Sequence, residues 1–231
     1  MNKKPRTTAI IVAAGSSSRM GGQVSKQLIE ICGKPVIAHT LAAFENALTV
    51  DDIIIAVRKQ DMIAVYDIIS YFGVKKVKSV VCGGTTRQQS VLSGLECAGD
   101  ADYIAVHDGA RALVRSGQID EVISAAYTYK AAMLGVPMKD TVKTVGKNRM
   151  TTGTADRSLM WLAQTPQAFE AGILKAAMEK AIAEHKDYTD ESQLVEALGH
   201  GVYLVNGGYD NIKITTPDDI ALAEQILANR G

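Results

Sequence analysis

Apolar, β-branched runs alternate with segments of helical spacing along the first half of the chain, and this alternation constrains the fold more than any other feature. The runs are AIIVA (9–13), DIIIAV (52–57), KVKSVV (76–81) and YIAVHD (103–108). Each is typical of a strand buried on both faces. Apolar residues recur three and four positions apart over residues 35–44, 62–72, 90–97 and 119–129. The alternation predicts an α/β fold, with a mostly parallel, twisted sheet and helices on both faces.

Residues 138–160 interrupt this pattern. The stretch is polar and threonine-rich, and a VGKN turn separates two short β-prone runs, which is typical of a hairpin. We expect a β-hairpin arm that protrudes from the sheet. Because no tandem repeat, low-complexity stretch or obvious linker occurs, we expect residues 1–231 to form one domain.

The C-terminal stretch NIKITTPDDIALAEQILANR predicts a strand followed by a helix. Thr216 is a suitable N-cap, Pro217 suits the first helical position, and two aspartates follow in the first turn. This start signal places Lys213 at the end of the predicted strand.

Charge and cysteine content exclude several classes of protein. The 25 basic and 25 acidic residues balance, so we expect neither a nucleic acid nor an anionic membrane as partner. No window approaches the roughly 18 apolar residues of a membrane helix. Three cysteines, Cys32, Cys82 and Cys97, lack the spacing of a disulfide framework or zinc site. We expect buried free thiols in a cytoplasmic protein.

Small and cationic residues follow the first predicted strand. Ala14 and Gly15 lead to Arg19, and Lys26 lies a little further on. Small residues let backbone N–H groups approach a phosphate, which a cation then neutralises. The stretch matches neither the P-loop nor the dinucleotide fingerprint, and an ordinary loop is the alternative interpretation.

The third and fourth predicted strands also end in polar residues. CGGTTRQQSV offers Thr85 and Ser90 as hydrogen-bonding groups beside a glycine pair, although a plain N-cap is equally compatible. HDGAR places Asp108 at a strand end, where a carboxylate can meet ribose hydroxyls or a phosphate-bound magnesium ion. The alternative is a helix cap paired with Arg111. No histidine has metal-ligand spacing, and no serine-hydrolase motif occurs.

Nine stretches together resemble one known family, in order and over nearly the whole chain. They are AAGSSSRM, SKQ, GKPVIAHTLAAF, GGTTRQQSV, HDGAR, DTVK, TADRSLMWLAQTPQAF, YTDES and NIKITTPDD. The chain is thereby identified as similar to the 2-C-methyl-D-erythritol 4-phosphate cytidylyltransferases. The resemblance implies a Rossmann-like nucleotidyltransferase fold and a Mg²⁺-dependent reaction of CTP with the sugar-alcohol phosphate in non-mevalonate isoprenoid biosynthesis. It also implies release of pyrophosphate, and a homodimer in which each arm embraces the partner.

The resemblance also implies roles for single residues. Arg19 and Lys26 would hold the CTP phosphates, and Asp108 the ribose or the metal ion. The nucleoside would contact Ala13, Ala14, Gly15, Gly84, Thr85 and Ser90. The acceptor phosphate would be held by Thr141, Arg157, Thr189 and Lys213, with Thr141 and Arg157 reaching across the dimer. Arg19, Lys26, Arg157 and Lys213 would be the catalytic cations.

The chain departs from the family pattern at Ser17, Ser25 and in the HDGARA stretch, where HDAARP is usual. These departures change loop geometry but remove no charged group. Two alternatives remain at this point: a ribitol 5-phosphate cytidylyltransferase, and a non-catalytic nucleotide-binding module.

Overall fold

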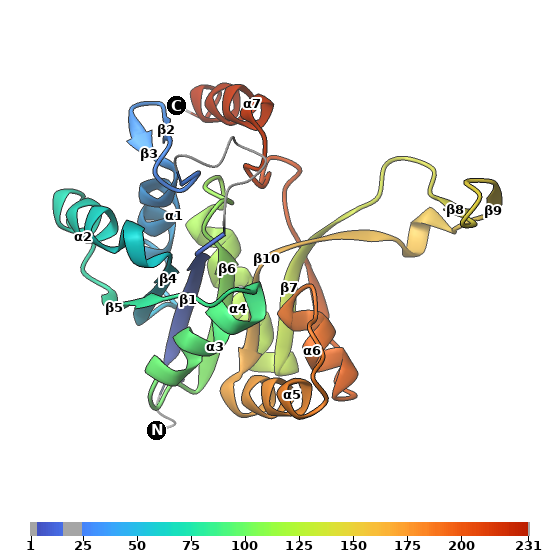
Figure 1. The fold of residues 1–231 in the computed structure, drawn as a ribbon, viewed down its shortest axis with the longest axis horizontal. Helices are drawn as coiled ribbons and strands as arrows, with labels where there is room; N and C mark the ends of the chain where they lie inside the picture. Colours follow the sequence, from blue (N-terminus) through green and yellow to red (C-terminus); the bar gives the residue numbers. More distant parts are fainter. Residues whose placement is uncertain (1–3, 16–24, 231) are drawn as a thin grey trace.

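A seven-stranded sheet forms the centre of the protein, whose computed structural model describes residues 4–15 and 25–230 (Figure 1). The strand order is β11-β7-β10-β6-β1-β4-β5. The bounds are β1 (Thr7–Ala13), β4 (Asp52–Val57), β5 (Val77–Cys82), β6 (Tyr103–Asp108), β7 (Ala131–Pro137), β10 (Trp161–Glu170) and β11 (Tyr203–Asn206). β10 runs antiparallel to β6 and β7, and the other neighbouring pairs of this sheet are parallel. The predicted mostly parallel sheet is confirmed.

Helices cover both faces of the sheet, as the alternation predicts. The helices of the described residues are α1 (Val36–Glu45), α2 (Met62–Tyr71), α3 (Arg87–Cys97), α4 (Ser116–Tyr129), α5 (Ala171–Ala183), α6 (Glu191–Ala197) and α7 (Pro217–Ala228), with short 3₁₀ turns at Lys59–Asp61 and Arg157–Leu159. The first six cover the sheet, and α7 packs in a separate apolar cluster. One apolar cluster joins the sheet to α1, α2 and α4, and a second joins it to α3, α5 and α6. Successive residues of β1 alternate between them, since Ile11 packs in the first and Ile10 in the second.

Helix α3 begins three residues before its predicted start. Thr86 caps it: the threonine hydroxyl accepts the Gln89 N–H at 3.2 Å, and the Gln89 side chain accepts the Thr86 N–H. This reciprocal capping box satisfies backbone donors of the first turn, so the helix extends back to Arg87.

The predicted strand before α7 is wrong. Residues 211–215 cross the carboxyl ends of the sheet strands and join no ladder. Their backbone N–H groups form hydrogen bonds with a loop and a side chain instead of a neighbouring strand. The Ile214 N–H donates to the Ala110 carbonyl at 2.9 Å, and the Thr215 N–H donates to Asp219 at 2.8 Å. The helix start is confirmed, with Thr216 as N-cap and Pro217 at the first helical position.

The predicted hairpin is present at the far end of an extension of β7 and β10 (Figure 1). Strands β8 (Lys143–Val145) and β9 (Thr151–Thr154) pair antiparallel, and the Gly146 N–H closes the turn on the Met150 carbonyl at 2.9 Å. Both strands are exposed along their whole length. The arm therefore projects away from the body of the subunit.

The expectation of buried thiols is wrong. Cys32, Cys82 and Cys97 are all exposed, and none of the three forms a disulfide. Cys82 ends an outer strand and Cys97 ends a helix, and both places leave side chains accessible. In the described part of the chain, no helix has the length and apolar character needed to cross a membrane.

Candidate functional site

A pocket of about 560 Å³ lies at the carboxyl ends of the central strands, where parallel sheets bind ligands. It brings together loops that follow β1, β4, β5 and β6. Of the residues predicted for the nucleotide or for catalysis, it is lined by Ala14, Gly15, Lys26, Gly84, Thr85, Ser90, Asp108 and Lys213. Ala13 is the buried last residue of β1, directly before this wall. Arg19 lies outside the described residues.

A second pocket, of about 200 Å³, adjoins the first and contains Thr189. Arg87, Asp108 and Lys213 line both pockets, so these three side chains form a shared wall. The β7–β10 register shifts between Ala163 and Gln167. Thr165, inside this irregularity, lines the smaller pocket; such breaks in pairing commonly re-aim side chains.

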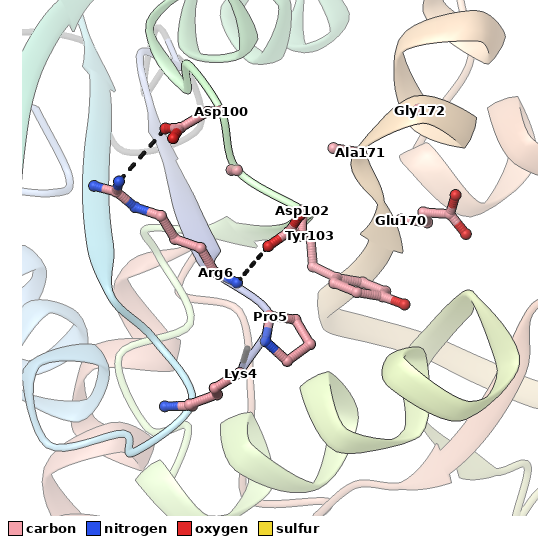
Figure 2. Close-up of a pocket in the computed structure, with 10 residues that line it drawn as sticks. Lys4, Pro5, Arg6, Asp100, Asp102, Tyr103, Glu170, Ala171 and Gly172 are labelled. Carbon is pink, nitrogen blue, oxygen red and sulfur yellow. Dashed lines mark hydrogen bonds and ion pairs between the residues drawn. The ribbon is translucent and has the colours of Figure 1, made fainter. Parts of the chain in front are cut away.

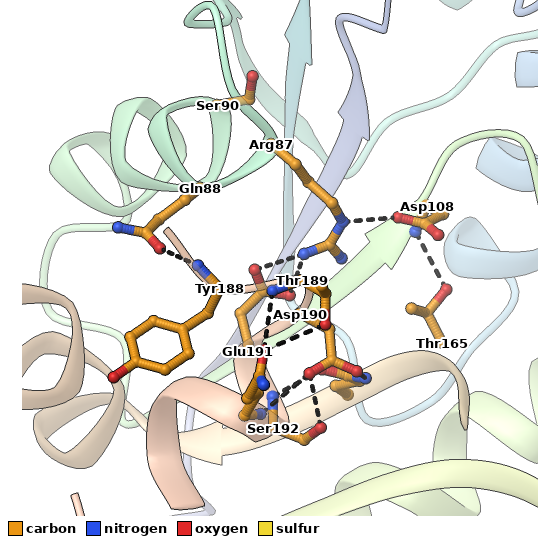
Figure 3. Close-up of polar contacts among 12 residues, drawn as sticks. Arg87, Gln88, Ser90, Asp108, Thr165, Tyr188, Thr189, Asp190, Glu191 and Ser192 are labelled. Atoms are coloured by element: carbon orange, nitrogen blue, oxygen red, sulfur yellow. Dashed lines mark hydrogen bonds and ion pairs between the residues drawn. The ribbon is translucent and has the colours of Figure 1, made fainter. Parts of the chain in front are cut away.

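Asp108 is the centre of the shared wall, and Figure 3 shows its contact with Arg87. Its carboxylate accepts from Arg87 Nε at 3.0 Å and from Lys213 Nζ at 2.7 Å, and Arg111 Nε lies 4.0 Å away. Arg87 in turn donates through Nη1 to both carboxylate oxygens of Glu191, at 2.6 and 2.8 Å. Side chains from four separate segments thus meet at the point where the two pockets join.

Charge pairing fixes the protonation of this wall. Burial alone would raise the pKa of the Asp108 carboxyl, but Arg87 and Lys213 outweigh it and hold that pKa well below its usual range. Burial likewise opposes the charge on Arg87, while Glu191 and Asp108 together raise the pKa of its guanidinium. Asp108 and Arg87 are therefore both charged at neutral pH.

The glycine loop after β5 packs directly against the loop after β1. A side chain at Gly83 would collide with Ala14 and with Ser90, so only glycine permits this approach of two backbones. Ser90 Oγ accepts the Gly84 N–H at 3.1 Å, and Thr85 Oγ1 donates to Gln89 at 2.7 Å. The loop therefore both caps α3 and lines the pocket, so the two interpretations of its sequence are compatible.

Two predicted residues lie apart from the pockets within one chain. Thr141 and Arg157 lie within the arm, residues 138–160, and neither lines either pocket. Arg157 Nη1 donates to the Lys139 carbonyl at 3.0 Å, at an exposed position. Within one chain, the structure does not bring them to the predicted acceptor site.

Five charged residues at the site were not among the predicted site residues. Arg58, Arg87, Arg111 and Asp190 line the pockets, and Glu191 is almost completely buried behind Arg87. Arg58 directly follows the strand at residues 52–57, and the same strand-end argument would have found it. Nothing local marks Glu191, because its partner lies 104 residues away in sequence.

Two of the departures from the family pattern, Gly109 and Ala112, fit the packing around them. Gly109 sits where an added side chain would come within 3.2 Å of Ala13 and Ile37, so glycine tightens this turn. Ala112 is buried in an apolar cluster with Leu113. Ser25 is also buried, and its hydroxyl has no hydrogen-bond partner among the described residues.

The metal-ligating groups at the site fit a magnesium ion that takes most of its ligands from a bound nucleotide. Asp108 supplies an ionised carboxylate, a hard oxygen ligand of the type Mg²⁺ prefers, and it is the only acidic residue among the described ones that line the larger pocket. Residues 4–15 and 25–230 contain no cluster of three or more metal-ligating side chains. A phosphate chain would have to provide most of the ligands.

A third hollow, of about 720 Å³, lies at the opposite end of the central strands from these two pockets (Figure 2). It surrounds Arg6, which pairs with Asp100 at 3.4 Å and donates its backbone N–H to Asp102 at 2.8 Å. Arg6 also pairs with Asp52 at 2.7 Å. These charged groups are paired with one another at the amino ends of the strands. We therefore place the functional site at the carboxyl ends, where parallel sheets bind ligands.

Comparison with known proteins agrees with the geometry. The family profile "2-C-methyl-D-erythritol 4-phosphate cytidylyltransferase" (IspD) matches residues 7–229. A protein of that name from Geotalea uraniireducens is 44% identical over 226 residues, covering 96% of this chain and 97% of its relative. The one from Lachnoclostridium phytofermentans is 43% identical over 224 residues, with 96% of each chain covered.

Solved structures give the same result. The 4-diphosphocytidyl-2C-methyl-D-erythritol synthase of Anaerococcus prevotii superposes with a TM-score of 0.88 at 32% identity, over 97% of each chain. The 2-C-methyl-D-erythritol 4-phosphate cytidylyltransferase of Thermus thermophilus gives 0.77 at 30% identity, over 97% of this chain and 99% of that one. This chain belongs to the 2-C-methyl-D-erythritol 4-phosphate cytidylyltransferase family.

Proposed function

We propose that this chain transfers the cytidylyl group of CTP to 2-C-methyl-D-erythritol 4-phosphate and releases pyrophosphate, as a step of non-mevalonate isoprenoid biosynthesis. The observation that carries the proposal is the shared wall of Arg87, Asp108 and Lys213 between two adjoining pockets. A group transfer between two anionic substrates needs two neighbouring sites with cations at their junction. We also propose a cytoplasmic location, because the proposed donor, CTP, is found there.

The larger pocket would hold CTP. Its small residues and glycines admit the nucleotide close to the backbone, and Asp108 would meet the ribose or the metal ion. Lys26 and Arg19 would grip the phosphates. The nucleoside would contact Ala13, Ala14, Gly15, Gly84, Thr85 and Ser90, all but Ala13 among the lining residues.

The smaller pocket would hold the acceptor. Thr189 and Lys213 line it, and Lys213 also faces the larger pocket, so its ammonium group can serve both phosphates. We propose that residues 1–231 form one domain and that two copies form a homodimer. The exposed arm of each copy, residues 138–160, would then bring Thr141 and Arg157 to its partner's acceptor pocket.

Charge neutralisation accounts for catalysis without a general base. An oxygen of the acceptor phosphate attacks the α-phosphorus of CTP in line, and pyrophosphate leaves on the far side. A phosphate monoester has a second pKa near 6, so it is largely dianionic at neutral pH and no group has to remove a proton. Lys26, Lys213 and Arg19 would offset the charge that accumulates in the transition state, and the planar fork of Arg157 would orient the incoming phosphate.

We include Mg²⁺ as the cofactor of this reaction. Asp108 would be its protein ligand, next to phosphate oxygens of the nucleotide. The ion would neutralise phosphate charge, while Lys213 and Arg87 keep the carboxylate ionised and in place.

The test is pyrophosphate release by the purified protein with CTP and Mg²⁺. One reaction receives 2-C-methyl-D-erythritol 4-phosphate, and a second receives ribitol 5-phosphate. Release with the first acceptor alone is the expected result. Release only with ribitol 5-phosphate would replace the acceptor, and CTP binding without release on either acceptor would indicate a non-catalytic nucleotide-binding module.

A further inference from the structure

His107 is a buried polar residue that the proposed mechanism does not use. It is the residue before Asp108 on β6, it has no exposed surface, and its ring packs against Phe44 of α1 with ring centroids 4.9 Å apart. It lines neither pocket. A wholly buried imidazole normally has both ring nitrogens paired, so its two partners indicate what it does.

Both ring nitrogens of His107 have partners. Nε2 lies 3.2 Å from the Arg111 carbonyl oxygen, and Nδ1 lies 3.1 Å from Thr165 Oγ1. A carbonyl can only accept, so Nε2 must carry the proton. Thr165 Oγ1 already accepts the Asp108 N–H at 3.1 Å, which leaves its own proton to donate to Nδ1. The hydrogen bonds thus run in one direction, from Asp108 through Thr165 and His107 to Arg111.

The two partners of His107 both belong to the smaller pocket. Thr165 and Arg111 line that pocket, and neither lines the larger one. Arg111 also donates to the Asn211 carbonyl at 2.7 Å, two residues before Lys213. The imidazole therefore ties together β6, β10 and the turn after β6, directly behind one pocket.

We propose that His107 is a positioning residue for acceptor recognition: as the neutral imidazole protonated on Nε2, it fixes Thr165 and Arg111 from behind the smaller pocket. It transfers no proton in the reaction. The assignment of the smaller pocket to the acceptor rests on the proposed function.

Steady-state kinetics test this role. His107→Phe keeps the ring and its contact with Phe44 but removes both hydrogen bonds. We expect about a tenfold rise in KM for the acceptor from the loss of these buried contacts, with KM for CTP changed by less than about twofold. His107→Gln, which retains a donor at the position of Nε2, should recover part of the effect and serves if the phenylalanine variant does not fold.

The matched control is Phe44→Leu, which removes the ring contact and leaves both hydrogen bonds. It should lower stability without a selective change in KM for the acceptor. Equal rises for both substrates in His107→Phe, or a selective rise in Phe44→Leu, would overturn the proposal.

¹⁵N NMR of the whole 231-residue chain tests the tautomer independently of activity. The His107 ring signals are identified by their absence in His107→Gln. We expect a protonated Nε2 and a bare Nδ1 at neutral pH, and a proton on Nδ1 would overturn the assignment. If the wild-type protein released no pyrophosphate with either acceptor, the proposed function would fail, and the spectrum would still decide the state of His107.

Discussion

Glu191→Gln is the substitution whose effect follows most directly from the structure. Glu191 is 1% exposed, and both of its carboxylate oxygens bind Arg87 Nη1. Removing one partner of a buried pair costs about 3–5 kcal/mol, because the other charge stays buried without compensation. Arg87 keeps Asp108 at 3.0 Å, so we expect a loss near the lower limit, about 3 kcal/mol.

Urea unfolding at pH 7 measures this loss. With a slope of about 2–3 kcal/mol per molar urea, the midpoint should fall by about 1 M. The double variant Arg87→Met, Glu191→Leu removes both charges, and we expect it to recover at least half of the lost stability, since apolar replacement of a whole buried pair is often neutral. A loss below about 1 kcal/mol in Glu191→Gln would refute the reasoning, because that is the size of an exposed ion pair.

Three further predictions concern catalysis, assembly and pH. Lys26→Ala should lower kcat by about a hundredfold, as expected for a cation that stabilises the transition state, and near-normal turnover would remove it from the catalytic role. Lys26→Ala and Arg157→Ala, inactive or impaired alone, should together form mixed dimers with one intact site, restoring about a quarter of wild-type activity after random exchange; no restoration would place the arm of each chain at its own site. Burial lowers the pKa of His107 to about 3, below its ordinary value of about 6.5. The unfolded chain therefore binds a proton that the folded chain does not, and stability decreases as the pH falls below about 6.5. At pH 5 the free energy of unfolding should be about 2 kcal/mol lower from this group, and His107→Gln should show a flatter dependence; an unchanged dependence in the variant would contradict the assignment.

The central strands and their helices could be predicted because their pattern is local. A run such as residues 52–57 is apolar at every position but the first, and in the sheet it is buried on both faces. Strand β10 carries no such pattern: its sequence WLAQTPQAFE is polar in the middle. Its pairing with β6 and β7 is decided by tertiary contacts, and sequence periodicity does not report them.

The same distinction holds at the site. Asp108 and Lys26 were found because they follow strands, and strand ends converge in a parallel sheet. The stretch NIKIT, residues 211–215, was predicted to be a strand, but these residues form hydrogen bonds to loops and side chains instead. The Arg87–Glu191 pair depends on tertiary packing that brings the N-terminal ends of α3 and α6 together, which no short stretch of sequence encodes.

The wall shared by the two pockets has a consequence for the end of the catalytic cycle. Under the proposed reaction, the product is one molecule that contains both the cytidine and the polyol, joined through a diphosphate. It would occupy both pockets at once. Binding of the cytidine half holds the polyol half near its pocket, and the reverse is also true, so the joined product binds more tightly than either half alone. We therefore expect strong product inhibition.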